Sequence, residues 1–321
     1  MGKTIGIYGG TFDPPHLGHM EAARAAAAML GLDELLFIPA KLPPHKELPE
    51  DAASPEQRLD MIAYVADALS LTLPCRVLDL ELRREGASYT ADTAEYLREQ
   101  YPDDTLWFLM GTDMFLSFQT WHEPERIVRC AGLCAFSRSE ADTAALFQKQ
   151  KEQLAALYPG ARIRILDLPQ VIEVSSTRLR RQLRDGGGGD HIWPPVYGYI
   201  LRNRLYGTAA DLTKLDLPEL RAAAQSYLKA KRIAHVLGTE EEAARLAERW
   251  GAEVLPARRA AILHDCTKYF TGPEQLKLCE KYGIVLDKLE QEIVKLQHAP
   301  TGAALARFVF GEEPAVCDAI R

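Results

Sequence analysis

Short apolar runs alternate with longer helical patterns along the first two thirds of the chain. The runs are rich in leucine, β-branched and aromatic residues and are bounded by glycine, proline or polar residues, as buried strands are. They occupy residues 4–8, 34–39, 76–82, 105–110, 133–136 and 162–166. Helical patterns lie between them, over residues 20–30 and 54–70 and from residue 88 onward. Strands that alternate with helices over short links indicate a parallel α/β sheet.

The pattern changes near residue 211. Alanine-rich, charged helical patterns follow one another from there, and no strand pattern returns. A helix over 194–206 is expected to close the first domain, and one over 239–251 is expected in the second. We therefore expect an α/β domain over residues 1–207 and an all-α domain over 208–321.

The first strand leads into a loop that suits a phosphate group. Its sequence is Gly9-Gly10-Thr11-Phe12-Asp13-Pro14-Pro15-His16-Leu17-Gly18-His19. The two adjacent glycines allow the backbone to approach a ligand closely. The helix that follows turns its amide donors and positive dipole end toward the loop. His16 and His19 stand three residues apart, so both could reach one anion from one face of a helix start.

The loop matches neither of two common phosphate-binding signatures and fits a zinc site poorly. Neither the dinucleotide fingerprint G-x-G-x-x-G nor the loop G-x-x-x-x-G-K-[ST] occurs at this place. Zinc takes three or four ligands, and no nearby cysteine or acid completes a set with the two histidines. A histidine that only caps or packs remains the default for either residue considered alone.

A second phosphate signal lies far away in the sequence. Ser175, Ser176 and Thr177 begin a basic helix, where hydroxyl groups cap and free amides point outward. Arg180 follows one turn later, and its planar guanidinium suits phosphate oxygens. A capped basic helix with no ligand would give the same pattern, but the first loop makes a triphosphate site the better interpretation.

The first loop resembles the paired-histidine signature of the nucleotidyltransferase superfamily, and specifically that of bacterial nicotinate mononucleotide adenylyltransferases. The segment Ser175-Ser176-Thr177-Arg178-Leu179-Arg180 resembles the motif with which that family cradles the ATP phosphates. The resemblance covers roughly residues 3–207 and implies a Rossmann-like sheet. It implies catalytic roles for His16, His19 and Arg180, and ATP contacts from Gly9, Gly10, Thr11, Phe12, Gly111, Ser175, Ser176 and Thr177.

The resemblance also implies a pocket for the pyridine mononucleotide. Its candidate residues are Asp13, Lys46, Tyr89, Thr90, Asp113, Trp121 and Arg138. From the residues alone, Lys46 could be a solvated loop lysine, Thr90 a helix cap and Trp121 a core residue. The resemblance favours binding, because a tryptophan at this spacing after Gly111-Thr112-Asp113 recurs in the nicotinate enzymes, and its flat ring could stack on a pyridine.

In the second domain, His235, His264, Asp265 and His298 supply nitrogen and oxygen ligands that suit a divalent transition metal. The segment from Ala260 to Lys268 is expected to place the His264–Asp265 pair on an apolar helix. Each of the four residues alone could be a hydrogen-bonded core residue. Together they resemble the HD-domain phosphohydrolases, most closely those that split diadenosine tetraphosphate symmetrically, which implies iron or manganese. The family pattern continues with another histidine and a later aspartate, and this chain ends at Arg321, so we expect an incomplete HD-type domain.

Composition and charge limit the partners. A net charge of -7 argues against a general nucleic-acid binder, whose binding face would be basic. Six cysteines without a C-x-x-C pair indicate reduced thiols. No apolar run reaches membrane-spanning length. We therefore expect a cytoplasmic protein with no membrane or nucleic-acid partner, while the sequence leaves its oligomeric state open, a homo-oligomer included.

These observations together predict an adenylyltransferase that joins nicotinate mononucleotide to ATP with Mg²⁺, giving deamido-NAD and pyrophosphate. A phosphopantetheine adenylyltransferase has a similar first loop, but the segment from Gly111 to Trp121 favours a pyridine substrate. A bifunctional enzyme, a chain that is chiefly a metal phosphohydrolase, and a nucleotide sensor without turnover also remain open. The choice between nicotinate and nicotinamide depends on donors that the sequence does not show.

Overall fold

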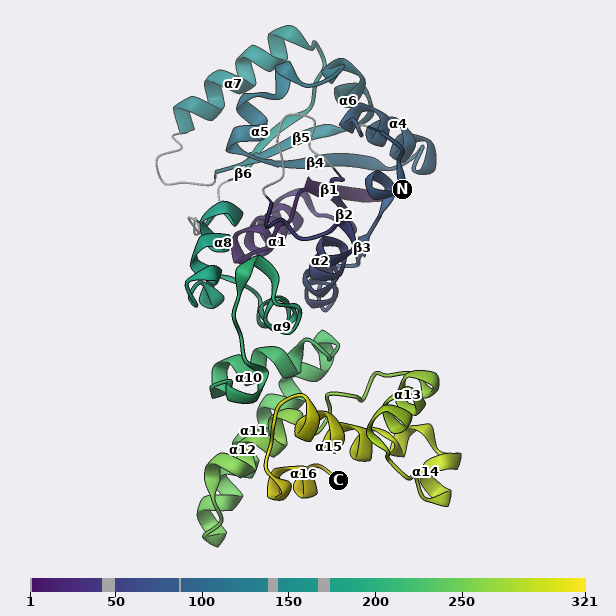
Figure 1. Cartoon of the computed structure of the whole chain (residues 1–321). Helices are drawn as coiled ribbons and strands as arrows, with labels where there is room; N and C mark the ends of the chain where they lie inside the picture. Colours follow the sequence, from purple (N-terminus) through teal and green to yellow (C-terminus); the bar gives the residue numbers. More distant parts are fainter. Residues whose placement is uncertain (1, 42–49, 87, 138–143, 167–173) are drawn as a thin grey trace. The chain divides into compact units, whose positions relative to one another are not determined.

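The computed structural model describes residues 2–41, 50–86, 88–137, 144–166 and 174–321. The chain forms two compact units (Figure 1). The first comprises Met1–Leu183 with Asp190–Ile192, and the second comprises Arg184–Gly189 with Trp193–Arg321. The contacts thus divide the chain before residue 207, where the sequence pattern places the boundary.

A six-stranded parallel sheet forms the centre of the first unit. Its strands are β1 (Thr4–Gly10), β2 (Glu34–Pro39), β3 (Cys75–Val77), β4 (Thr105–Gly111), β5 (Gly132–Phe136) and β6 (Ile163–Leu166). Their order across the sheet is β3-β2-β1-β4-β5-β6, and every neighbouring pair is parallel. The expected Rossmann-like α/β fold is therefore confirmed.

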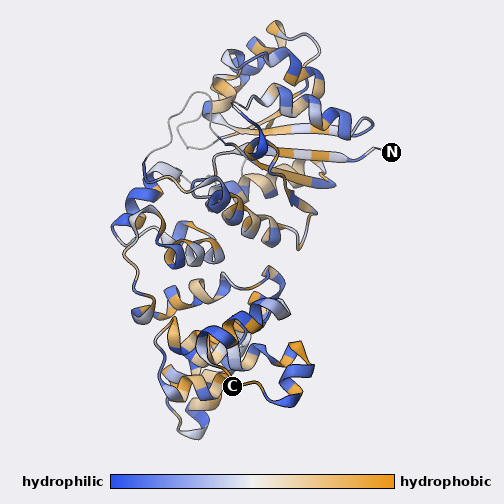
Figure 2. Cartoon of the chain, turned by 45° about the vertical axis from the view of Figure 1, so that its right-hand side comes forward, coloured by the Kyte–Doolittle hydropathy of each residue, from blue (hydrophilic) through white to orange (hydrophobic). Residues whose placement is uncertain are grey.

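Helices cover both faces of this sheet. The helices of this part of the chain are α1 (Leu17–Leu30), α2 (Pro55–Leu69), α3 (Leu80–Arg83), α4 (Thr90–Gln100), α5 (Thr112–Leu116), α6 (Pro124–Cys130), α7 (Ala144–Leu157) and α8 (Ser176–Arg184), with 3-10 turns at Phe118–Thr120 and Gly189–His191. Figure 1 shows α1 and α2 on one side of the sheet and α4, α5, α6 and α7 on the other. Because both faces are covered, the central strands β1, β2, β4 and β5 are largely buried. Figure 2 shows apolar residues, in orange, along the strands.

Local signals in the sequence set several helix ends. Ser54 caps α2, because its hydroxyl accepts a hydrogen bond from the Gln57 amide at 3.2 Å and the Gln57 side chain accepts one from the Ser54 amide at 2.9 Å. Pro55 occupies the first helical position, where its missing N–H costs nothing. Gly31 ends α1 in the left-handed conformation, with φ of 60°.

The second unit is helical throughout. Its elements are α9 (Pro194–Asn203), α10 (Leu217–Gln225), α11 (Ala230–Trp250), α12 (Val254–Leu263), α13 (Gly272–Tyr282), α14 (Lys288–Glu292), α15 (His298–Phe308) and α16 (Pro314–Ile320), with 3-10 turns at Leu205–Gly207, Leu212–Lys214 and Val294–Leu296. The core includes Leu220, Leu263 and Phe310. Among the described residues of the whole chain, no helix is long and apolar enough to cross a membrane.

The strand predicted over residues 76–82 is wrong beyond Val77. β3 lies at the edge of the sheet and pairs only with β2, so little holds it extended. The chain turns into α3, where the buried Glu81 accepts a hydrogen bond from the Thr93 hydroxyl at 2.9 Å. This bond connects the segment to α4. Leu78 and Leu80, whose alternation suggested a strand, pack against the core of the first unit instead.

Helix boundaries were also wrong at three places in the second unit. α11 begins at Ala230 rather than at residue 239, because the buried Ile233 and Val236 continue its apolar stripe. α12 ends at Leu263, so the His264–Asp265 pair lies in the turn after the helix rather than on it. α9 ends at Asn203, because Arg204 adopts φ of 51°, which a helix does not allow.

The close approach of α9 and α10 requires glycine at position 198. A Cβ atom at Gly198 would lie 1.9 Å from the carbonyl oxygen of Ala222, whereas one at the exposed Gly238 in α11 would meet nothing within 4 Å. We expect Gly198→Ala to destabilise the protein by about 1–3 kcal/mol through overpacking. Gly238→Ala should stabilise it by up to about 1 kcal/mol, since alanine favours a helix. Thermal unfolding followed by circular dichroism compares the two, and equal melting temperatures would contradict the close approach.

Candidate functional site

The candidate site lies where the strand order reverses. β1 and β4 are neighbours in the sheet but are far apart in sequence, and open α/β sheets bind ligands beyond the carboxyl ends of such strands. The paired register of β1 and β4 runs to Tyr8 and Leu109, so Gly10 and Gly111 each lie two residues further along. The predicted glycine loop and the predicted Gly111 segment therefore share one edge of the sheet.

The loop after β1 has an unusual backbone. Phe12 adopts φ of 50°, a region that large side chains rarely enter, and it is almost fully buried. A Cβ atom at Gly10 would lie 3.0 Å from the Phe12 ring, whereas one at Gly9 would meet nothing within 4 Å. Gly10 is therefore needed for packing against Phe12, and open space above Gly9 allows a ligand to approach the backbone.

The two histidines lie together at the start of α1. His16 precedes the helix and His19 lies in its first turn, and their ring centroids are 3.8 Å apart. The backbone amide of His16 donates to Nδ1 of His19 at 3.1 Å. Because that nitrogen accepts, the proton of the neutral His19 ring is on Nε2, which makes Nε2 a hydrogen-bond donor. Each side chain is only 7% exposed, so charges that develop nearby would be poorly screened.

The second predicted phosphate motif meets the first loop. Arg180, in α8, donates to the backbone carbonyl of Asp13 at 2.7 Å, and its guanidinium lies 3.5 Å from the Asp13 carboxylate. The Ser176 hydroxyl donates to the Pro14 carbonyl at 3.0 Å. The start of α8 therefore lies beside the first loop although more than 160 residues separate them. Ser175 and Thr177 are exposed at that helix start.

Asp13 has a structural partner that the sequence did not suggest. Its carboxylate accepts a hydrogen bond from the Ala53 amide at 3.0 Å, in addition to the ion pair with Arg180. Asp13 is only 2% exposed. Its contacts in the structure therefore organise the loop, while a contact to the mononucleotide remains a prediction.

Two aromatic residues predicted to bind the pyridine nucleotide, Tyr89 and Trp121, are connected through His122. Tyr89 precedes α4, and its ring lies 4.1 Å from that of His122 at an interplanar angle of 32°. His122 directly follows Trp121, which is partly buried and packs against Phe118 at 5.3 Å between ring centroids. Trp121 thus has a core contact and also an exposed fraction. Asp113 is exposed in α5, which begins immediately after Gly111.

Thr90 begins α4 and is partly buried, next to Tyr89. The other two predicted mononucleotide residues, Lys46 and Arg138, lie outside the described part of the chain.

Sequence reasoning missed Arg58, which the structure places under this site. Arg58 is fully buried in α2 and donates to the backbone carbonyls of Thr11 and Ala40 at 2.9 and 2.5 Å, and to that of Lys41 at 3.1 Å. It therefore holds two segments: the first loop, which joins β1 to α1 and is named the phosphate loop, and the chain that leaves β2. The sequence shows only an arginine in an amphipathic helix, which is ordinarily solvent-exposed, so no local signal identifies it.

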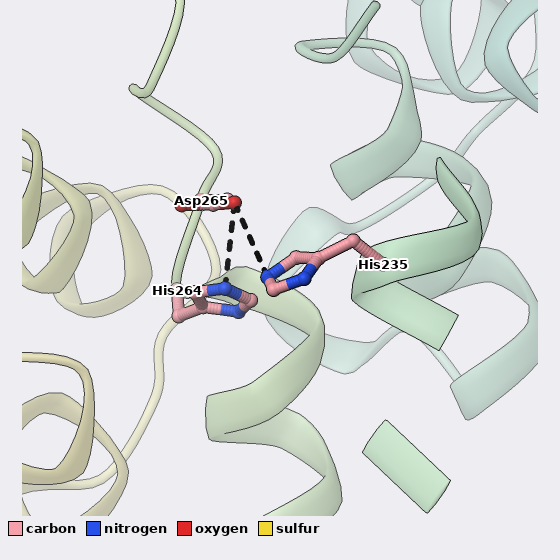
Figure 3. Close-up of side chains that lie close together, drawn as sticks. All are labelled: His235, His264 and Asp265. Atoms are coloured by element: carbon pink, nitrogen blue, oxygen red, sulfur yellow. Dashed lines mark ion pairs between the residues drawn. The ribbon is translucent and has the colours of Figure 1, made fainter. Parts of the chain in front are cut away.

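In the second unit, the predicted metal ligands surround one buried carboxylate. Asp265 is 1% exposed, and its Oδ2 lies 3.4 Å from Nε2 of His264 and 3.9 Å from Nε2 of His235 (Figure 3). One atom from each of these residues falls within a group no wider than 4.8 Å. His298 is next to them, with Nε2 3.6 Å from Oδ1 of Asp265, but Lys268 also approaches this nitrogen at 3.1 Å. The structure thus brings all four predicted residues together, and three converge.

The electrostatics of this cluster centre on Asp265. Burial opposes ionisation of its carboxyl, but His264 and Arg232 outweigh burial and hold its pKa well below the ordinary range. Burial also acts against protonation of His264, yet Asp265 and the Ala261 carbonyl raise the His264 pKa. Desolvation lowers the pKa of His235, and the charge of Arg232 lowers it further.

The donor set fits a divalent metal ion. Nδ1 of His264 lies 2.6 Å from the Ala261 carbonyl, so the proton of the neutral ring is on Nδ1 and Nε2 is directed at Asp265 as a potential ligand. Histidines that bind metals are typically oriented by such a bond to a carbonyl. Two imidazole nitrogens and one carboxylate are ligands that divalent transition metals accept.

Comparisons with known proteins find relatives of both units. Residues 7–182 match the family described as cytidylyltransferase-like. A protein of Neisseria meningitidis serogroup C, "Probable nicotinate-nucleotide adenylyltransferase", is 40% identical over 208 residues, which is 64% of this chain and 98% of that protein. A protein of Carboxydothermus hydrogenoformans with the same name is 36% identical over 206 residues, again covering 64% and 98%.

A solved structure supports the fold. The nicotinic acid mononucleotide adenylyltransferase of Plasmodium falciparum, complexed with APC, aligns with a TM-score of 0.52 at 20% identity, over 64% of this chain and 97% of that one. Residues 232–321 match the HD domain. The chain therefore belongs to the cytidylyltransferase-like family, among the nicotinate-nucleotide adenylyltransferases, and it carries an HD domain in its C-terminal part.

Proposed function

We propose that the first unit transfers AMP from ATP to nicotinate mononucleotide, releasing pyrophosphate and forming deamido-NAD. This proposal rests on the contact between the two motifs that the sequence predicts to bind phosphate. Arg180 and Ser176, from the second motif, donate hydrogen bonds to backbone carbonyls of the first loop. This contact brings the start of α8 to the loop that precedes the two buried histidines. The names of the relatives support the choice of substrate.

The mechanism needs no nucleophile from the protein. The phosphate of the mononucleotide is already charged at neutral pH and attacks the α-phosphorus of ATP; the new P–O bond forms as the bond to pyrophosphate breaks. Catalysis is then positioning plus charge stabilisation. We assign donors to the α-phosphate to His16 and His19, and contacts with the β- and γ-phosphates to Arg180, Ser176 and Thr177. Mg²⁺ bound to ATP would offset phosphate charge and assist departure of pyrophosphate.

The other assignments follow the resemblance of the sequence motifs to those of the family. We assign ATP contacts along the backbone to Gly9, Gly10, Thr11, Phe12, Gly111 and Ser175. For the mononucleotide we propose Tyr89, Thr90, Asp113 and Trp121, together with Asp13, Lys46 and Arg138. We also propose that the transferase domain extends through residue 207, because the named relatives align over about that length. The six free thiols favour a reducing compartment, and we propose the cytoplasm.

The defining experiment measures pyrophosphate release by the full chain with ATP and Mg²⁺. We expect rapid turnover with nicotinate mononucleotide and much slower turnover with nicotinamide mononucleotide or phosphopantetheine. Faster release with phosphopantetheine would contradict the substrate assignment. No release with any of the three would contradict the proposed transferase activity itself.

One substitution can separate the proposed catalytic role of His19 from its hydrogen bond with the His16 amide. In His19→Asn, the side-chain oxygen can still accept from the His16 amide, but the donor at Nε2 is lost. We expect kcat to fall about 100- to 1000-fold, as for removal of one donor to a developing charge, with little change in KM for ATP. His191→Ala, at a histidine of the same unit whose side chain is 40% exposed, is the matched control. A kcat of His19→Asn close to that of the control would rule out the assignment.

We propose that the second unit binds a divalent transition metal, iron or manganese, through His235, His264 and Asp265, with His298 nearby. The convergence of two imidazole nitrogens on a buried carboxylate supports this. When bound, such a metal would activate water and polarise phosphoryl oxygens. A second function, hydrolysis of a nucleotide phosphate ester or anhydride such as diadenosine tetraphosphate, rests on the HD domain alone. Arg232 and Lys268 add positive charge beside the cluster, which suits an anionic substrate.

Metal binding can be tested without reference to activity. His235 is 45% exposed at its side chain, so His235→Ala removes one ligand without opening the core. We expect it to weaken binding of Mn²⁺ at least about tenfold, because ligands and the residues that orient them typically carry such an effect. Calorimetric titration of metal-stripped full chain with Mn²⁺ measures this, with His191→Ala as the surface-histidine control. Equal affinities in both variants would contradict the proposed ligand set.

A further inference from the structure

The start of α2 places a buried charge between two loops of the transferase site. Arg58 is fully buried, although a charged side chain rarely is unless it has strong partners. Its Nη1 donates to the carbonyls of Thr11 and Ala40, and its Nη2 donates to the carbonyl of Lys41. Backbone carbonyls of two separate segments thus share one guanidinium.

Arg58 makes these hydrogen bonds at the place where the pairing of β1 with β2 ends. The ladder ends with Gly10 opposite Pro39, and the Ala40 amide donates to the Gly10 carbonyl at 2.9 Å. Beyond that bond the two chains diverge, one into the phosphate loop and the other through Lys41. The next carbonyls, those of Thr11, Ala40 and Lys41, are partly buried and lie beyond the paired residues, so they need donors from elsewhere. Arg58 supplies those donors at the point of divergence.

The contact at Thr11 also fixes the direction of an amide. The peptide that joins Thr11 to Phe12 is planar, and its C=O and N–H groups point in opposite directions. When the Thr11 carbonyl is held by Arg58, the Phe12 amide must point away from Arg58. Phe12 itself is in a backbone region that surrounding contacts must stabilise, with φ of 50°. The loop is held again one residue later, where Arg180 binds the Asp13 carbonyl.

We propose that Arg58 is a positioning residue for the adenylyl transfer: it holds the phosphate loop after β1 and the residues that follow β2, Ala40 and Lys41, in one fixed relation. This inference rests on the proposed function of the first unit. Arg58 acts through the backbone and does not touch the substrates. A lysine would keep the charge but not the planar fork that reaches all three carbonyls, so the loops would lose their common anchor.

Arg98 provides a matched control at the other end of the sheet. It lies in α4 and likewise donates to backbone carbonyls, those of Tyr101, Pro102, Asp104 and Cys130. These carbonyls lie in the segments that lead into β4 and β5, at the amino ends of the strands and away from the candidate site. Arg98→Lys therefore makes the same chemical change to a similar anchor without touching either loop.

The experiment compares Arg58→Lys, Arg58→Gln and Arg98→Lys in the full chain, with pyrophosphate release from ATP and nicotinate mononucleotide as the readout. Rates are expressed per folded molecule, measured by circular dichroism well below the melting temperature of each variant. We expect Arg58→Lys to lower kcat about 10- to 100-fold, the effect of misplacing reacting groups by about an ångström. Arg58→Gln should lower it further, and Arg98→Lys should leave kcat within about twofold of wild type, as expected for a site that does not affect positioning.

An active wild-type chain in which Arg58→Lys and Arg98→Lys have the same kcat per folded molecule would overturn the inference. So would failure of both Arg58 variants to fold while Arg98→Lys folds, since Arg58 would then be required for folding. A wild-type chain that releases no pyrophosphate overturns the proposed function, and this inference with it. That result is distinguishable from the others because it is seen before any substitution is made.

Discussion

The hydrogen bond from Arg180 to the carbonyl of Asp13 is the contact on which the transferase site depends. It joins α8 to the first loop of the same unit across 167 positions of sequence, at 2.7 Å and away from solvent. A guanidinium can be buried here because the Asp13 carboxylate, at 3.5 Å, offsets its charge. Ser176 reinforces the junction with its bond to Pro14. These two bonds together bring the two predicted phosphate motifs side by side.

The loop between β1 and α1 is held on more than one side. Arg58 holds Thr11 from α2, and Arg180 holds Asp13 from α8, so the left-handed Phe12 lies between two anchored carbonyls. His16 and His19 then follow at the start of α1, with the His16 amide fixing the tautomer of His19. A preorganised arrangement of this kind stabilises charge in a transition state without having to reorganise when the reaction occurs.

In the second unit, neighbouring side chains likewise stabilise a buried charge, that of the Asp265 carboxylate. Asp265 is buried and holds its charge because His264 and Arg232 lie beside it. His264 and His298 each bond to a backbone carbonyl through Nδ1, and this orients their Nε2 atoms toward Asp265. Two of these histidines lie in turns or at the start of a helix, and His235 lies within α11, so the cluster depends on how α11, α12 and α15 pack.

The sequence by itself determined the parallel α/β class, the helical second unit, and both phosphate motifs, because strand and helix periods, glycine pairs and capping hydroxyls are local properties. It also indicated which residues gather around Asp265. It did not determine the short edge strand β3 or the early start of α11, because edge pairing and side-chain burial decide those boundaries. Only the tertiary structure showed that Asp13 is tied to Arg180 and Ala53, and that Arg58 joins two loops. Those roles consist of bonds to backbone carbonyls, and backbone carbonyls leave no signature in the identity of the residues that carry them.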